Sequence, residues 1–399
     1  MANADPKANP KATLKLMIPG PTPLPDSVRE ALGRPAIGHR SPEFKAILNR
    51  VLPRLQWAFQ TKNDVLLFTA SGTAAAEAAI INTLNPGDTV LVLVCGVFSA
   101  RWGEVAKSLG MQVETIEVPP GQANTVASLK ARLDADTAKT IKMVAVTHSE
   151  TSTGVQNPVA EMTALIKAHG ALSLVDAVTS LGAAEFRTDD WGVDLAFSGS
   201  QKGFMIPPGL SFLTVSERAW QAHKAVKNPG FYFNFTRYKK AQDDFTTPYT
   251  PATALIIALD EALAMMEAEG LEAITARHAL LRNMVRAGVG ALGLKTVVNQ
   301  HTEASYAVTS VTPPDGVTVD ALRKGLKNDF GILVADGQKE LKGRIFRIGH
   351  LGHVFPTDVL ATLAALEQTL YRLGYTQAKP GAAVAAAQEV ALSLTPATP

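Results

Sequence analysis

The sequence predicts an α/β protein with a mostly parallel sheet in a large domain and a small α+β domain at the carboxyl-terminal end. Between residues 64 and 216, short runs that are apolar throughout alternate with segments of helical periodicity. Uninterrupted apolar runs are typical of strands buried on both faces of a parallel sheet that is covered by helices. After Pro251 the pattern changes to one long helical segment, followed by helices mixed with short strands. This change predicts a second domain that begins near Leu271.

In the large domain, predicted as residues 14–270, six apolar runs are expected to form the sheet. These strands are residues 64–70, 88–94, 141–148, 171–176, 193–199 and 210–216. Helical periodicity between and after them predicts helices at 71–84, 101–110, 157–170 and 252–270.

The small domain, predicted as residues 271–377, contains helices and strands in mixed order. Its predicted helices are 271–292, 318–329 and 356–374, and its predicted strands are 295–299, 305–312, 332–336 and 344–350. Residues 1–13 and 378–399 are rich in Ala and Pro, so we expect flexible tails there, either disordered or forming a flexible helix.

Composition narrows the class of protein and its partners. Lys and Arg number 38 against 36 Asp and Glu, a balance that gives no basic surface for nucleic acid. The one cysteine, Cys95, excludes a disulfide framework and supplies too few thiolates for an iron–sulfur or structural zinc site. No apolar stretch reaches the length of about 20 residues that spans a membrane, and the opening lacks the apolar region of a secretory signal. We expect a cytoplasmic protein that binds small molecules or another copy of itself.

Unusual residues follow five of the predicted strands, where parallel α/β sheets bind their ligands. Ser71-Gly72-Thr73 follow the first strand and open a helix, which suits a phosphate, although taken alone they are better explained by an ordinary Ser/Thr cap, which is far commoner. Phe98 follows the second strand and is either a core residue or a ring that stacks on a flat ligand. The other three positions are the stretch 148–154, Asp176 and Lys202.

Asp176 and Lys202 carry the strongest chemical indication. A carboxylate at the end of an apolar strand either caps the next turn or binds a protonated ligand nitrogen. Lys202 lies in "FSGSQKGFMIPPG", where glycines, serines and prolines favour a tight turn near a ligand. A lysine in such a site can become a nucleophilic amine that forms a Schiff base. Together, a phosphate cradle, a stacking ring, an aspartate and a reactive lysine predict pyridoxal 5′-phosphate (PLP) as cofactor.

The chain resembles class V aminotransferases of fold type I, most closely the alanine–glyoxylate and serine–glyoxylate (serine–pyruvate) aminotransferases. The likeness runs from about Leu16 to Tyr375 and rests on several ordered motifs. They are "PGPTPLP", "IGHRSPEF", "SGTAAAEAA", "HSETSTG", "VDAVTSLG", "SGSQKG", "PPG", "YTPAT" and "FRIGHLG".

The resemblance implies a role for each motif residue. Lys202 would be the Schiff-base lysine and proton carrier, and Asp176 would pair with the pyridine nitrogen of the cofactor. Phe98 would stack on the ring, Ser152 would lie near the ring and the bound substrate, and Arg347 would bind the substrate carboxylate. The residues implied to hold the phosphate are Ser71, Gly72, Thr73, Gln201 and, from the other subunit of a homodimer, Thr250. Some relatives have tyrosine where Thr247 stands, which leaves open whether Thr247 or Tyr249 contacts the phosphate. Some have tryptophan in place of Phe98 or His in place of Thr73.

The implied reaction is a ping-pong transfer of the amino group of L-alanine or L-serine to glyoxylate, with pyruvate or hydroxypyruvate and glycine as products. A ureidoglycine–glyoxylate aminotransferase stays open as an alternative. A desulfurase-type lyase needs a mobile nucleophilic cysteine, and Cys95 ends a buried strand. A hydrogenase subunit, a label that some members of the family have carried, needs several cysteines. A cofactor-binding scaffold without activity is disfavoured because Lys202, Asp176 and Arg347 are all present.

Three further stretches receive structural interpretations. The pair His350 and His353 lacks a third metal ligand, and His350 is expected to border the substrate site beside Arg347. "FYFNFTRYKKAQDDF", residues 231–245, is interpreted as a loop or subunit contact. "IGHRSPEF", which contains His39 and Arg40, would lie near the dimer interface and the active site by the resemblance, and a structural role is expected for it.

Overall fold

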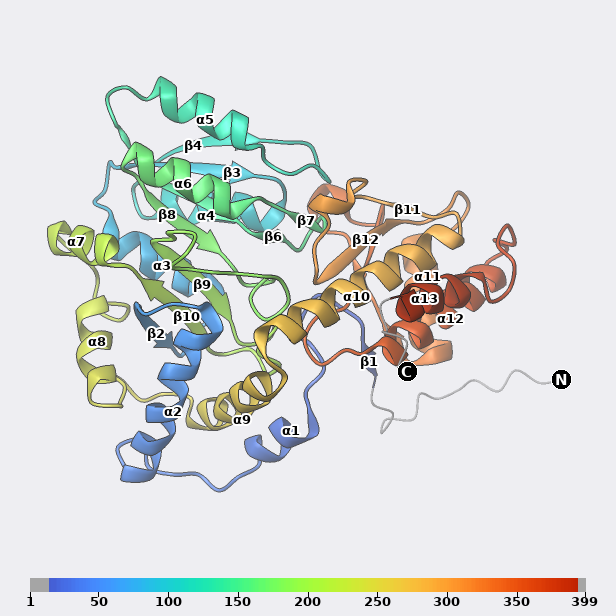
Figure 1. Cartoon of the computed structure of the whole chain (residues 1–399), viewed down its shortest axis with the longest axis horizontal. Helices are drawn as coiled ribbons and strands as arrows, with labels where there is room; N and C mark the ends of the chain where they lie inside the picture. Colours follow the sequence, from blue (N-terminus) through green and yellow to red (C-terminus); the bar gives the residue numbers. More distant parts are fainter. Residues whose placement is uncertain (1–13, 394–399) are drawn as a thin grey trace.

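The computed structural model describes residues 14–393, so the predicted tail 1–13 and the last part of the predicted tail 378–399 lie outside the described residues. A large domain carries a seven-stranded sheet, and a smaller domain lies beside it, with helix α10 (Leu271–Ala291) running from one into the other (Figure 1).

The central sheet has the strand order β2-β10-β9-β8-β5-β3-β4. Only β10 runs antiparallel to its neighbours. The bounds are β2 Asp64–Phe68, β3 Thr89–Val94, β4 Gln112–Glu117, β5 Ile141–Thr147, β8 Leu172–Asp176, β9 Leu195–Gly199 and β10 Ser211–Val215. The α/β prediction is therefore confirmed, and all six predicted strands are present. The seventh, β4, escaped prediction because it forms the edge of the sheet and is half-exposed, so it lacks a continuous apolar run.

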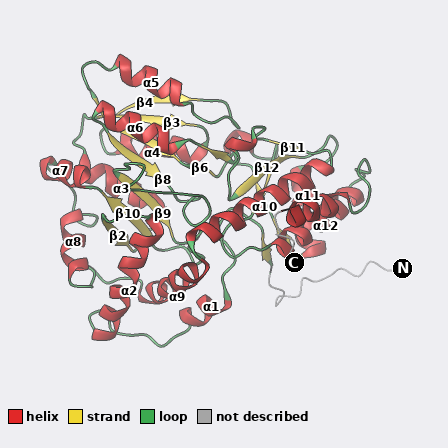
Figure 2. Cartoon of the chain, viewed as in Figure 1, coloured by secondary structure: helices red, strands yellow, loops and turns green. Residues whose placement is uncertain are grey.

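Helices cover both faces of this sheet (Figure 2). Successive strand residues point to opposite faces, so Leu67 packs into one apolar core and Leu66 into the other. Burial of a leucine of this kind stabilises the fold by about 1.5–3 kcal/mol. The first core includes residues of α2 Pro42–Phe59, α5 Val126–Ala135, α6 Val159–His169 and α9 Thr253–Glu269. The second includes residues of α3 Gly72–Thr83, α4 Val97–Ser108, α7 Glu217–Ala225 and α8 Phe235–Asp243.

Helix α8 corrects the loop alternative for residues 231–245, whereas the alternative of a subunit contact stays a prediction. Asn234 caps the helix by accepting a hydrogen bond from the backbone N–H of Arg237. Phe235 and Tyr238 are buried on one side, where the ring of Tyr238 contacts Phe68 of the sheet. The basic residues between these aromatics are therefore the solvent side of a helix that covers the sheet.

The small domain is built around a four-stranded sheet in the order β11-β12-β15-β14. Its bounds are β11 Lys295–Thr296, β12 Val308–Thr312, β14 Ala335–Asp336 and β15 Phe346–Gly349, packed with α10, α11 Val319–Phe330 and α12 Pro356–Arg372. The predicted strand 332–336 is divided, because β13 (Ile332–Leu333) leaves this sheet and pairs in parallel with β1 (Lys15–Leu16) near the start of the described chain. A short helix, α1 (Asp26–Leu32), connects β1 to α2 and packs on α9.

The end of the described chain differs from the flexible tail that its composition suggests. Residues Ala382–Ser393 form helix α13, which packs against α10 and α12. Ala383 and Ala387, one helical turn apart, are fully buried. Gly288 of α10 allows this close approach, since a Cβ there would lie 3.0 Å from the carbonyl oxygen of Ala383. Small residues therefore pack tightly where the alanine-rich composition suggested disorder or a flexible helix.

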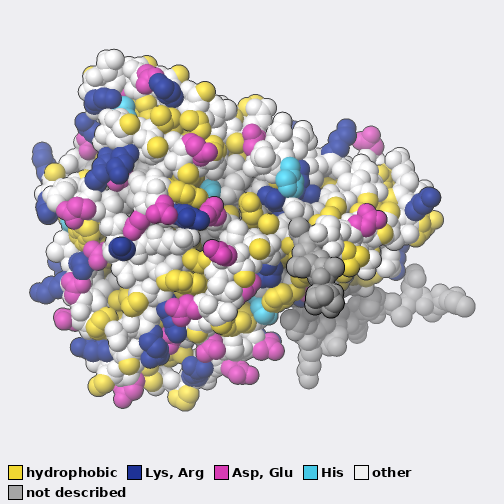
Figure 3. Space-filling view, in the orientation of Figure 1, with side chains coloured by type: hydrophobic (Ala, Val, Ile, Leu, Met, Phe, Trp, Pro, Cys, Tyr) yellow, Lys and Arg dark blue, Asp and Glu magenta, His cyan; other side chains and the backbone are white. Residues whose placement is uncertain are grey.

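Charged side chains of both signs are interspersed on the face drawn in Figure 3. Between residues 14 and 393, no helix is both long and apolar enough to cross a membrane.

Candidate active site

Five strands that carry the predicted site residues run in the same direction, so their carboxyl ends share one edge of the sheet. Ser71 follows β2 and Phe98 follows β3 along this edge. The stretch 148–154 follows β5, Asp176 ends β8 and Lys202 follows β9. The sheet thus brings the five predicted positions to one side of the large domain.

Lys202 and Arg347 come from different domains and line the same pocket of about 330 Å³. Phe98 and Thr151 contribute to its wall from the large domain. The small domain and the start of the described chain supply most of the remaining wall, including Gly20, Arg323, Asp336 and Gln338. The pocket therefore lies between the sheet edge and the small domain.

Lys202 is almost completely buried and its side chain points at a backbone carbonyl. Its Nζ donates a hydrogen bond of 2.5 Å to the oxygen of Pro19. Burial, followed by the nearby positive charge of Arg347, lowers the pKa of Lys202 to about 8, while Asp176 opposes the shift. A fraction of the amine is therefore neutral near physiological pH, as a nucleophile requires.

Asp176 is a buried carboxylate with few partners of its own. Its Oδ1 accepts a 2.9 Å hydrogen bond from the backbone N–H of Val178, so the predicted turn cap is present. Burial raises the pKa of Asp176 to about 7, and nearby Glu150 adds to the shift. Lys202 is close enough to oppose it. A carboxylate so destabilised in its charged form fits a protonated ring nitrogen, which would supply the missing positive charge.

The start of α3 has the features of an anion site. Ser71 is the N-cap residue, yet its hydroxyl makes no capping hydrogen bond and the residue is exposed. The first backbone N–H groups of a helix have no partners within it and favour a negative charge. Gly72 packs close to the turn after β8, since a Cβ there would lie 3.0 Å from Cγ2 of Val178. Thr73 and Gln201 are both partly buried.

Glu150, which we did not single out in the sequence, organises the base of the site. Its fully buried carboxylate accepts hydrogen bonds from the backbone N–H groups of Phe98 and Ser99, at 3.2 and 2.8 Å, in the first turn of α4. It also accepts bonds from the hydroxyls of Ser99 and Ser152, at 2.9 and 2.7 Å. The signal was available, because Glu150 lies within "HSETSTG".

Ser152 is fully buried below the pocket wall. Its hydroxyl donates to Glu150 and accepts a 3.0 Å bond from the backbone N–H of Val97. The hydroxyl therefore has both a hydrogen-bond acceptor and a donor within the protein. Thr151, its neighbour, lines the pocket instead. Contact of Ser152 with a cofactor or substrate remains a prediction.

Arg347 of β15 is held by two backbone carbonyls. Its Nε donates to the oxygen of Asp336 at 2.8 Å and its Nη1 to the oxygen of Thr151 at 3.0 Å. Burial lowers the pKa of Arg347 to about 10, which nearby Asp336 and Glu150 counteract. The guanidinium remains charged at neutral pH and has donors left for a carboxylate.

Thr250 is exposed, and it does not line the pocket of its own chain. Nearby, the hydroxyl of Thr247 donates to the carbonyl of Tyr249 at 2.7 Å, and that of Tyr249 donates to Phe231 at 2.9 Å. Both candidates for a phosphate contact already have internal acceptors.

His350 does not border the pocket, contrary to our expectation. It is fully buried, and its two ring nitrogens lie 3.0 Å from the hydroxyl of Thr309 and 2.9 Å from the carbonyl of Tyr306. His350 thus faces the interior of the small domain, where it joins β12 to the end of β15.

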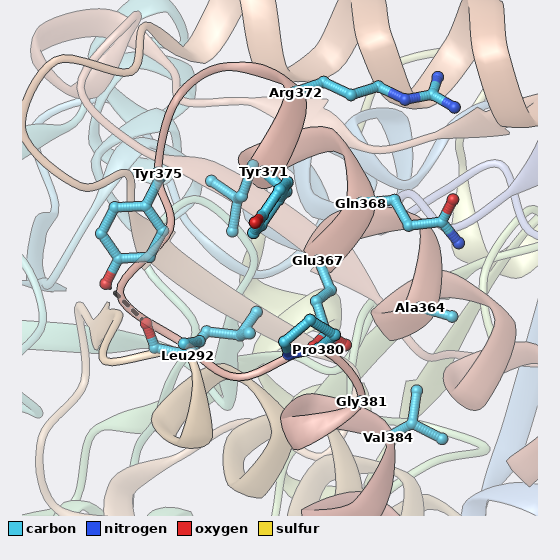
Figure 4. A pocket seen from close by; sticks show the side chains of 12 residues that line it. Leu292, Ala364, Glu367, Gln368, Tyr371, Arg372, Tyr375, Pro380, Gly381 and Val384 are labelled. Atoms are coloured by element: carbon cyan, nitrogen blue, oxygen red, sulfur yellow. Dashed lines mark hydrogen bonds between the residues drawn. The ribbon is translucent and has the colours of Figure 1, made fainter.

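A separate cavity of about 460 Å³ lies between the ends of α10, α12 and α13 (Figure 4). Its wall includes Leu292, Tyr371, Tyr375 and Val384, and the hydroxyl of Tyr375 donates to the carbonyl of Leu292. It contains neither a lysine nor a histidine. Among the predicted site residues, Phe98, Lys202 and Arg347 line the smaller pocket instead.

The site combines a buried lysine, a buried carboxylate with a single backbone hydrogen bond, a helix N-terminus without a side-chain cap, and a buried arginine. This combination fits a PLP-dependent enzyme of the α/β type. Comparison with known proteins identifies the family. The model for class V aminotransferases matches residues 27–346. The chain belongs to this family, is an aminotransferase and uses PLP, on which the family depends.

Individual relatives resemble the chain over nearly its whole length. A protein of Synechococcus sp. named soluble hydrogenase, small subunit, is 50% identical over 94% of this chain and 97% of its own. The serine–glyoxylate aminotransferase of Hyphomicrobium methylovorum is 39% identical over 94% of each. The crystal structure of ureidoglycine–glyoxylate aminotransferase from Bacillus subtilis superposes with a TM-score of 0.91, at 30% identity, and covers 96% of this chain and 98% of that one.

Proposed function

We propose that the enzyme transfers the amino group of L-alanine or L-serine to glyoxylate in two half-reactions, giving pyruvate or hydroxypyruvate and then glycine. The observation that carries the proposal is the shared pocket of Lys202 and Arg347, with the buried carboxylate of Asp176 close to the lysine. When bound, PLP supplies an electron sink for the charge left on the substrate α-carbon after deprotonation.

The chain's own residues do the rest in this proposal. Lys202 Nζ binds the cofactor covalently and, once released, carries a proton away from the substrate α-carbon. Asp176 keeps the ring nitrogen protonated, and Phe98 stacks on the ring. Arg347 holds the substrate carboxylate and fixes the orientation of the α C–H bond. The phosphate is held by Ser71, Gly72, Thr73 and Gln201, together with Thr250 of the partner subunit, and Ser152 supports the site from below.

The charges of the pocket favour a donor with a single carboxylate. Its charged lining residues are Lys202, Arg323, Asp336 and Arg347. Lys202 is used by the cofactor, and Arg323 lies 3.6 Å from the carboxylate of Asp336. Within one chain this leaves one positive charge, that of Arg347, for the substrate, which suits alanine, serine and glyoxylate better than a dicarboxylic acid.

A desulfurase activity does not fit the only cysteine. Cys95 is buried, and burial raises the pKa of its thiol to about 12, so it is not a thiolate at neutral pH. A hydrogenase role does not fit either, since an iron–sulfur centre needs several cysteines and the chain has one.

The test is an absorbance titration of the purified enzyme loaded with PLP. A band near ~420 nm is expected for the bound cofactor. It should fade with L-alanine or L-serine, change much less with L-aspartate, and return with glyoxylate. Ureidoglycine should be included, because the Bacillus subtilis enzyme with a similar fold is named for that donor. Absence of the band after PLP addition would overturn the proposal. A response to ureidoglycine alone would mean that ureidoglycine, and not L-alanine or L-serine, is the amino donor.

A further inference from the structure

We propose that the backbone at Pro19 and Gly20 is the resting place of the Lys202 amine whenever that amine is not bound to the cofactor, which makes Gly20 a positioning residue. The inference rests on the proposed role of Lys202. The amine must leave the cofactor when a substrate amine replaces it, and it must then wait nearby. Because Lys202 is only 8% exposed, water cannot take over all its hydrogen bonds, and the carbonyl of Pro19 receives one of them at 2.5 Å.

Only glycine fits at position 20. A Cβ built there would lie 2.7 Å from Cδ of Lys202 and 2.8 Å from both Cε and Nζ. The backbone φ of Gly20 is +140°, a region that residues with side chains rarely adopt. The space that a side chain would fill is therefore occupied by the end of the Lys202 side chain.

The segment around Gly20 is fixed on both sides of the pocket. Thr22 donates from its hydroxyl to the carbonyl of Lys202 at 3.0 Å and from its backbone N–H to the carbonyl of Gln201 at 3.2 Å. On the other side, the carbonyl of Met17 accepts a 2.8 Å bond from the N–H of Gly349, at the end of the strand that carries Arg347. With the segment tied to both domains, an added methyl group at position 20 would displace the lysine side chain.

The contact has a defined chemical effect. The carbonyl of Pro19 only accepts a hydrogen bond and exchanges no proton with the amine. One N–H of Lys202 is directed to it, and the remaining positions on Nζ are free to face the reacting α-carbon. A methyl group at position 20 would remove this orientation without removing the amine.

A double-mutant cycle on cofactor-free protein tests the contact. Gly20→Ala is made in the wild-type chain and in Lys202→Ala, which removes the three atoms that the new Cβ would meet. Backbone strain at position 20 is the same in both backgrounds, whereas the overlap exists only in the first. We expect Gly20→Ala to lower the melting temperature by about 2 °C or more beyond its effect in Lys202→Ala. Equal losses would mean that only the backbone is strained, and would overturn the proposal.

Cofactor capture gives the second readout. Added PLP is expected to produce the absorbance band of the bound cofactor at a measurable rate. We expect this rate to fall about tenfold in Gly20→Ala, because the new methyl group displaces the Lys202 amine by about 1 Å. Gly33→Ala is the matched control, because φ there is −89° and the nearest atom to a new Cβ is 3.6 Å away. A rate equal to wild type in Gly20→Ala contradicts the inference. If the wild type itself captures no PLP, the proposed function fails, whereas the melting cycle still reports on the contact.

Discussion

At the scale of single residues, Asp176 is expected to make the stability of the cofactor-free protein depend on pH. The unfolded chain ionises this group near its ordinary pKa of 3.8, whereas burial raises the pKa in the folded protein to about 7. The folded state therefore holds the proton more tightly, and stability present below pH 4 is lost as the pH rises through 7. We expect the melting temperature of Asp176→Asn to exceed that of the wild type increasingly between pH 4 and 8.

The comparison requires melting curves of both proteins without PLP across this range. Added PLP should restore stability to the wild type at pH 8 and do so much less for the variant, because the ring nitrogen has lost its counter-charge. Parallel curves for the two proteins would contradict a buried, destabilised carboxylate.

Glu150 is predicted to be the most sensitive carboxylate near the site. Glu150→Gln replaces one acceptor oxygen with an NH₂ group that faces the donors of Phe98, Ser99 or Ser152. A buried donor left without an acceptor costs about 1–3 kcal/mol, and we expect a loss of about 2–4 kcal/mol in the free energy of unfolding. Urea denaturation measures it.

Glu161→Gln is the control for this change. Glu161 also lies in the first turn of a helix, α6, but it is exposed. Glu161→Gln should lower the free energy of unfolding by less than about 1 kcal/mol. Similar losses in the two variants would show that helix-terminal charge, rather than the buried network, accounts for the effect.

The site residues that could be predicted from the sequence lie at or near the ends of apolar strands. Asp176 ends an apolar strand, and Phe98 and Lys202 lie within a few residues of the ends of two others, so a polar or aromatic side chain there stands out from its surroundings. Pro19 acts through its carbonyl oxygen, which every residue has, and the bonds of Glu150 depend on the approach of α4 to the loop after β5. A backbone carbonyl leaves no mark on composition or spacing, and the position of Glu150 in "HSETSTG" marks the residue but not its partners.

At the scale of elements, helix α13 is predicted to stabilise the small domain. Ala387→Asp would bury a carboxylate against α10, and we expect it to lower the free energy of unfolding by about 2–4 kcal/mol. Ala385→Asp, on the exposed side of the same helix, should change it by about 0.5 kcal/mol or less. Thermal unfolding measures both, and an equal response would mean that α13 does not stay packed in solution.

The helices and strands that were predicted correctly from the sequence include all the fully buried strands of the central sheet. All six predicted strands of the large domain are nearly or completely buried, and their continuous apolar runs revealed them. Helix α2 was not predicted; it is amphipathic and contains Pro53, which reads as a breaker. The packing of helix α13 was not predicted, and a disordered tail or a flexible helix was expected, because alanine has little hydrophobic signal of its own. These elements depend on neighbours that the local sequence does not contain.

At the scale of the whole molecule, the proposed homodimer accounts for an exposed aromatic surface. Phe231 is 64% exposed and Tyr232 is 40% exposed, and the ring of Tyr232 stacks on Tyr249 beside Thr250. If Thr250 completes the phosphate site of the other subunit, Phe231→Asp should shift the protein towards monomer and lower its affinity for PLP at least tenfold.

Sedimentation or light scattering gives the mass, and absorbance titration gives the affinity. Tyr371→Asp, at a residue that is 55% exposed in the small domain, is the control and should change neither. A monomeric wild type that binds PLP with full affinity would remove the partner subunit from the site.

The reversed direction of β10 has a consequence for where a reactive residue can stand. In an all-parallel sheet, a strand is followed by a crossover helix that carries the chain back to the opposite edge. Because β10 returns antiparallel beside β9, residues 200–210 stay at the edge where β9 ends. This gives the lysine a short loop that is joined to a strand of the sheet at each end, so its backbone stays close to the sheet edge. The single antiparallel strand thus keeps the lysine at the edge of the sheet where the other candidate site residues lie.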